Sequence, residues 1–154
     1  MSLRTNQKGF TIVELLIVVV VIAILAAISI VAYTGITNRA NTSASIETAN
    51  SVKAVAVAYQ GANGGYPTTK ALFVSGGADP IAKLPSDIIF TPTTAFSGAV
   101  AAAAALTNPK AVIVYPCLTN GFRIFYKDYS AGTGVSMDAG DCTTAPGAAI
   151  TPIV

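Results

Sequence analysis

A long apolar run dominates the N-terminal part of the chain. Residues 15–32 (LLIVVVVIAILAAISIVA) contain a single polar side chain, Ser29. Strands in globular proteins usually have about 3–10 residues, and a segment inside a bilayer must satisfy its own backbone hydrogen bonds. The run therefore predicts a helix, and its 18 residues are long enough to make it a candidate membrane span.

The helical pattern continues beyond the apolar run. Residues 36–59 are more polar, but apolar side chains recur there at helical spacing. These are Ile46, Ala49, Val52, Ala56 and Tyr59. No Pro occurs before Pro67, and a Gly-rich stretch from Gly61 supplies a stop. We expect one helix over residues 10–60, apolar all round in its first half, amphipathic in its second, and loosened at Gly35.

The rest of the chain predicts a small head that contains β-structure. Residues 111–115 (AVIVY) and 121–129 (GFRIFYKDY) are rich in β-branched and aromatic residues and are bounded by Pro116 and Gly132, as is typical of strands. Weaker patterns predict short helices near residues 69–74 and 99–106, and strands near residues 88–91 and 135–137. The expected fold class is α+β, a long N-terminal helix packed on a small antiparallel sheet.

Alternate side chains of residues 121–129 predict how this sheet packs. One face carries Phe122, Ile124 and Tyr126, and the other carries Arg123, Phe125 and Lys127. We expect the first face to pack on the amphipathic helix and the second to meet solvent. The aromatic side chains Phe125, Tyr126 and Tyr129 are expected to be core or subunit contacts, the alternative being an exposed adhesive or electron-transfer stripe.

Charge and composition narrow the function. Arg4 and Lys8 precede Phe10, and the other seven basic residues balance the seven acidic ones, so the net charge of +2 lies in the N-terminal segment. The bulk of the chain therefore gives no sign of direct nucleic-acid binding, and the basic N-terminus predicts a cytoplasmic location for that end. The chain has no His, which excludes Ser–His and Cys–His dyads and the common zinc sets. We predict no catalytic, metal or cofactor site.

The chain has two cysteines, Cys117 and Cys142. In a chain with an export-like segment, such a pair is expected to form one disulfide outside the cytoplasm. The alternative is two free buried thiols.

The most specific motif is Lys-Gly-Phe-Thr-Ile-Val-Glu at residues 8–14. Glu14 would be costly in a membrane span without a partner. A cut between Gly9 and Phe10 would create an α-amine with a pKa near 8, and Glu14 lies four residues on, on the same face of the expected helix. The amine of a neighbouring subunit is an equally good partner. The alternative is an acid at headgroup level, favoured only by the helix dipole.

This motif resembles the prepilin leader and N-terminal helix of type IV pilins and pseudopilins, closely over about the first 30 residues. The resemblance implies cleavage after Gly9 by a prepilin peptidase and methyltransferase, N-methylation of Phe10, and assembly through Glu14 of a homo-oligomeric helical filament. It implies a non-enzymatic subunit that spans the cytoplasmic membrane once and is then carried by pilus assembly machinery to the cell surface. The segments would be a leader at 1–9, a long helix at 10–60 with 10–33 in the membrane or filament core, and a head at 61–154.

Several alternatives stay open at this point. Unlike many type IV pilins, residues 15–33 contain neither Gly nor Pro. The chain could instead be a pseudopilin of a type II secretion or competence system, or a singly anchored membrane protein whose head binds a ligand. An ordinary signal peptide cut after Ala27 is a weaker rival. Asp138 and Asp141, with Asp128, could hold Ca²⁺ or could simply form turns. Adhesion, twitching motility, DNA uptake and secretion are not separated by the sequence.

Overall fold

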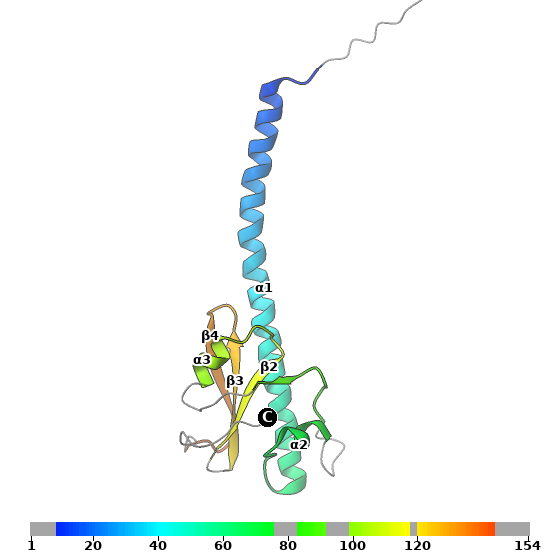
Figure 1. Cartoon of the computed structure of the whole chain (residues 1–154), viewed down its shortest axis with the longest axis vertical. Helices are drawn as coiled ribbons and strands as arrows, with labels where there is room; N and C mark the ends of the chain where they lie inside the picture. Colours follow the sequence, from blue (N-terminus) through cyan, green and yellow to red (C-terminus); the bar gives the residue numbers. More distant parts are fainter. Residues whose placement is uncertain (1–8, 76–82, 92–98, 118–119, 144–154) are drawn as a thin grey trace, which may run out of the picture. The chain divides into compact units, whose positions relative to one another are not determined.

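The computed structural model describes residues 9–75, 83–91, 99–117 and 120–143 (Figure 1). The chain divides into two compact units, Met1–Thr37 and Asn38–Val154, and the boundary falls inside the first helix. The α+β fold class predicted from the sequence is confirmed. Residues 1–8 of the expected leader, and residues 144–154 of the expected C-terminal loop, lie outside the described residues.

Helix α1 covers Ile12–Asn63 and continues through Gly35. It ends where Gly64 adopts a φ of 74° and its N–H donates to the Gln60 carbonyl at 2.8 Å, a common helix termination by glycine. The long helix expected over residues 10–60 is therefore confirmed, with ends shifted by two or three residues.

The second part of α1 packs through one narrow stripe. Its buried residues are Ser45, Thr48, Ala49, Val52 and Ala56. The sequence placed Ile46 on this stripe, and that was wrong: Ile46 is 38% exposed. Successive residues of an α-helix are rotated by about 100°, so the side chain next to a buried Ser45 points away from the core.

The sheet has four strands in the order β1-β2-β3-β4. They are Ile89–Phe90 (β1), Ala111–Pro116 (β2), Gly121–Asp128 (β3) and Thr133–Gly140 (β4). β2, β3 and β4 are antiparallel, as expected, but β1 pairs in parallel with β2, so the sheet is mixed.

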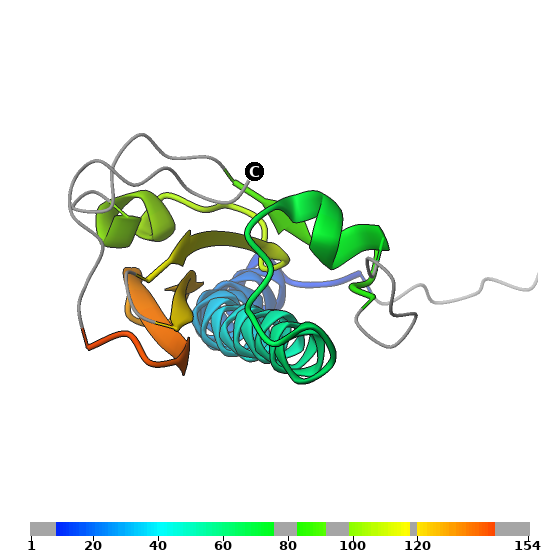
Figure 2. The same ribbon diagram turned by 90° about the horizontal axis from the view of Figure 1, so that it is seen from below.

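The two faces of the sheet are covered by different helices. Figure 2 shows α1 on one side of the strands and the short helix α3, Ala99–Ala104, on the other. On the α1 side, Val112, Phe122 and Ile124 pack with Ala49 and Val52. Helix α2, Lys70–Ser75, adds Phe73 to this core, with its ring 5.3 Å from that of Phe90 and 6.0 Å from that of Phe122.

The expectation that the second sheet face meets solvent was wrong at its centre. Phe125 is 2% exposed because it packs with Ala99 and Ala103 of α3 and with Ile113 and Tyr115 of β2. Arg123 and Lys127 are only partly exposed. Phe125 and Tyr126 are thus core residues, as expected. The alternative of an exposed aromatic stripe formed by Phe125, Tyr126 and Tyr129 does not fit, because two of its three residues are buried.

Candidate functional site

The start of α1 is built by a reciprocal cap between Thr11 and Glu14. Glu14 Oε2 accepts from the Thr11 N–H at 2.8 Å and from the Thr11 hydroxyl at 2.7 Å. The Glu14 N–H in turn donates to Thr11 Oγ1 at 3.2 Å. This is a capping box, which satisfies donors that a helix N-terminus otherwise leaves free. Sequence reasoning missed the role of Thr11, although the signal was present as Thr11-x-x-Glu14 directly before an apolar run.

Gly9 and Phe10 precede this cap in non-helical backbone. The Phe10 side chain is 82% exposed, and no heavy atom lies within 4 Å of where a Cβ on Gly9 would be. The expectation that Phe10 and Glu14 share a helix face assumed a helix from residue 10. In the structure α1 begins at Ile12, and Glu14 bonds Thr11. Cleavage after Gly9, methylation of Phe10 and the assembly role of Glu14 remain predictions.

The first part of α1 exposes apolar side chains on every side. The large hydrophobic residues between Phe10 and Ile36 are 47–83% exposed. Within α1, a window of 18 residues has a mean hydropathy of 3.4, and none of it is buried. By length and composition this helix can cross a membrane. An apolar surface of this extent needs lipid or other protein to cover it.

The cysteine pair closes the sheet end of the head. Cys117 and Cys142 form a disulfide with a Cα–Cα distance of 5.3 Å, in agreement with the prediction. The bridge links the residue after β2 to the segment after β4. Both cysteines are buried, and the N–H of Asp141 donates to the Asn120 carbonyl beside them at 2.9 Å.

The carboxylates considered for Ca²⁺ are engaged elsewhere. Asp138 pairs with Arg123 through Nε at 2.5 Å and Nη2 at 2.8 Å, and this raises the pKa of Arg123. Asp141 accepts from the Thr143 N–H at 3.0 Å and from its hydroxyl at 2.8 Å, and the backbone bond lowers the pKa of Asp141. Among the described residues, no three His, Cys, Asp or Glu side chains gather as metal ligands. The turn interpretation fits Asp141, whereas Asp138 lies in strand β4 opposite Arg123 of β3.

Asp128 joins the β3–β4 turn to α1. Its Oδ1 accepts from the Ser130 N–H at 2.8 Å, the Ala131 N–H at 3.1 Å and the Thr42 hydroxyl at 3.1 Å. Thr42 Oγ1 itself accepts from the N–H groups of Tyr129 at 3.0 Å and Ser130 at 3.1 Å. The backbone bond from Ala131 is the main cause that lowers the pKa of Asp128. We call this group of residues 42 and 128–131 the turn clasp.

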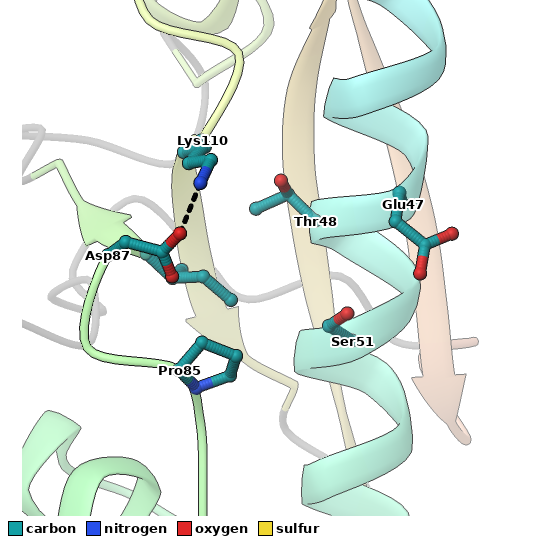
Figure 3. A pocket seen from close by; sticks show the side chains of 7 residues that line it. Glu47, Thr48, Ser51, Pro85, Asp87 and Lys110 are labelled. Carbon is teal, nitrogen blue, oxygen red and sulfur yellow. Dashed lines mark hydrogen bonds and ion pairs between the residues drawn. The ribbon is translucent and has the colours of Figure 1, made fainter.

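A polar cavity of about 180 Å³ lies between α1 and the segment before β1. Figure 3 shows Thr48 and Ser51 of α1 facing an ion pair between Lys110 and Asp87, while Glu47 points away. The hydrogen bond from Lys110 lowers the pKa of Asp87. Thr48 donates back to the Ala44 carbonyl of its own helix at 2.8 Å. The charges of Lys110 and Asp87 neutralise each other, and we assign this cavity no catalytic or binding role.

Comparison with known proteins identifies the N-terminal segment. Residues 4–30 match the model of the prokaryotic N-terminal methylation motif. The matched residues include the Gly9-Phe10 junction, the capping box and most of the exposed apolar helix. Searches of curated proteins and of solved structures returned no match to this chain.

Proposed function

We propose that this chain, which carries the type IV pilin and prepilin signature at residues 4–30, is a structural subunit of a type IV pilus filament. The motif and the apolar helix support a protein of the type IV pilin or pseudopilin type, and the motif marks a structural, pilin-like protein. The observation that carries the finer proposal is that the motif coincides with a helix whose apolar side chains are exposed all round. Neighbouring helices in a filament would cover that surface.

The motif implies processing by a prepilin peptidase, and we place the cut between Gly9 and Phe10. The exposure of Phe10 and the open space around Gly9 support this position, because a peptidase needs an accessible, extended backbone. Methylation would then fall on the amine of Phe10. The leader 1–9 would be lost, leaving the helix with its apolar first part, residues 10–33, and the head at residues 61–154.

Assembly through Glu14 follows from its chemistry. Its Oε2 is held by Thr11, and a cationic amine is the partner that would offset a carboxylate in an apolar environment. An amine of Phe10 from a neighbouring copy supplies that charge and fixes the axial register between packed helices. The partner in this proposal is a second copy of the same chain.

The proposed location changes with assembly. The motif and the apolar helix are consistent with insertion into the membrane followed by surface assembly. We place the N-terminus in the cytoplasm because Arg4 and Lys8 precede the span. The head would then lie outside the cytoplasm, where the Cys117–Cys142 bond can form and persist.

A pseudopilin of a secretion or competence system is the second candidate, because the same motif and helix serve it equally well. A singly anchored binding domain is a candidate of another class. An anchored binding domain differs from a pilin or pseudopilin at the N-terminus, since it has no need of a mature chain that starts at Phe10.

The test combines two measurements on native cells. Mass spectrometry of the purified protein should find a mature chain that starts at methylated Phe10. Electron microscopy of sheared surface material should find fibres whose main band is this chain. An intact Met1 or a start after Ala27 would overturn the processing step. Correct processing without fibres of this chain would favour the pseudopilin.

A further inference from the structure

The stretch of α1 directly before the turn clasp is not buried against the head. Residues 33–40 are exposed, except for Thr37, which is partly exposed. Gly35 lies within it, and Gly is the least favourable helix former after Pro. The Thr34 hydroxyl bonds the Val31 carbonyl at 2.9 Å, and the Thr37 hydroxyl bonds the Tyr33 carbonyl at 3.2 Å. Such back-bonding slightly destabilises a helix.

The turn clasp begins directly after this stretch. Thr42 contributes one hydroxyl that both donates to Asp128 and accepts from two N–H groups of the β3–β4 turn. Asp128 is ionised at neutral pH, so its contact with Thr42 is a charge-assisted hydrogen bond. A helix turn that opens at Thr42 must break this group of bonds at once.

Core packing follows within one turn of the clasp. Ser45 and Ala49 are 1% and 0% exposed, and Thr48 is buried between them. Opening of α1 past Thr48 would therefore expose the core that the sheet forms with Ala49 and Val52. Residues of α1 before the clasp are therefore not buried, whereas Ser45, Thr48 and Ala49, just after it, are buried in the head.

We propose that the turn clasp is a stop for local unfolding of α1. Backbone hydrogen bonds of residues 34–41 open and close without disturbing the head, and opening ends at Thr42 because the next turn is fastened to Asp128. The device lets the helix before the head change conformation while the packing of the second part of α1 on the sheet stays intact. This inference does not depend on filament formation.

Hydrogen exchange of the full chain in detergent micelles tests the proposal. Amides of residues 34–41 should exchange at least tenfold faster than amides of residues 48–56, which are held by the core. Opening of residues 34–41 also frees the amides of residues 42–45, because these amides donate to carbonyls of that stretch. The stop is therefore measured at residues 46 and 47, whose acceptors are the carbonyls of residues 42 and 43. Thr42→Val removes the hydroxyl but keeps the shape, and should speed exchange at residues 46 and 47 about tenfold, since a bond to a charged group is lost. Thr42→Ser keeps the hydroxyl and is the matched control, with exchange close to that of the unsubstituted chain.

Exchange in β2 separates a local stop from a general effect. Its amides should be equally protected in all three proteins, because the head stays folded. The proposal is overturned if residues 34–41 are as protected as residues 48–56, or if Thr42→Val leaves residues 46 and 47 unchanged. It is also overturned if Thr42→Val removes protection from β2, since the clasp would then hold the whole head together.

Discussion

Gly134 is the position where a single methyl group tests the packing of α3 on the sheet. A Cβ at Gly134 would lie 2.0 Å from the carbonyl oxygen of Val100 and 3.0 Å from the Ala103 Cβ. The first of these is a backbone atom, so no side-chain rotation can relieve the clash. Gly134→Ala therefore forces α3 away from β4 and loosens the contacts that bury Phe125.

The expected loss follows from two opposing effects. Overpacking of a well-packed region costs about 1–3 kcal/mol, and contact with backbone at this distance places Gly134→Ala near the upper end. Replacing Gly also removes freedom from the unfolded chain, which returns about 0.4–1 kcal/mol. The net loss of unfolding free energy is thus about 2 kcal/mol. For a unit of this size the melting temperature should fall by about 8 °C.

Urea unfolding of the full chain in detergent measures this loss. The chain has no Trp, so near-ultraviolet circular dichroism of its six Tyr residues reports tertiary packing. Gly61→Ala is the control, because Gly61 lies in α1 with no heavy atom within 4 Å of an added Cβ. It should be stabilising by about 0.5–1 kcal/mol. A Gly134→Ala protein within about 0.5 kcal/mol of the unsubstituted chain would refute the placement of α3 against β4.

Four further outcomes are expected. Glu14→Ala should leave membrane insertion and leader cleavage intact but abolish fibres, because a buried amine then lacks its carboxylate; normal fibre counts by electron microscopy would defeat the assembly role. Thr11→Val should weaken the cap of α1 by about 1 kcal/mol, seen as faster amide exchange in the first helical turn, whereas Thr11→Ser should not. Reduction of the Cys117–Cys142 bond should lower the unfolding free energy by about 3 kcal/mol in a paired urea titration, and no change would mean that the loop is already ordered without it. Asp128 has a pKa below its ordinary 3.8, so its stabilising contribution is complete above that value and is lost as the pH falls through the lower, folded pKa. Asp128→Asn should therefore reduce the slope of stability against pH below 4, and an unchanged slope would contradict the clasp.

The elements with strong local patterns were predictable from the sequence. The long helix, strands β2 and β3 and the disulfide came from apolar periodicity, β-branched runs and cysteine count. β4 was predicted over residues 135–137 but covers Thr133–Gly140. It has few apolar residues, and its length is set by pairing with β3, from Gly121 opposite Gly140 to Asp128 opposite Thr133.

The long-range arrangement was not predictable from local patterns. Alternation in β3 correctly separated two sheet faces, but nothing local shows that an alanine-rich helix covers the second face. The signal, in hindsight, is Phe125, a large apolar residue on a face otherwise occupied by Arg123 and Lys127. Strand β1 has only two residues, and it pairs in parallel with β2, with Ile89 opposite Ala111 and Phe90 opposite Val112. Its local sequence does not indicate which strand it pairs with or in which direction.

The capping box has a consequence for the order of events in biogenesis. Both of its residues, Thr11 and Glu14, lie on the C-terminal side of the Gly9-Phe10 junction, and the described hydrogen bonds at the start of α1 include none from Gly9 or Phe10. A cut at that junction would leave the helix start as it was and would add only a charge beside it. Under the proposed cleavage, folding and maturation would be uncoupled: the precursor could complete its helix before it meets the peptidase, and the peptidase would not have to unwind it.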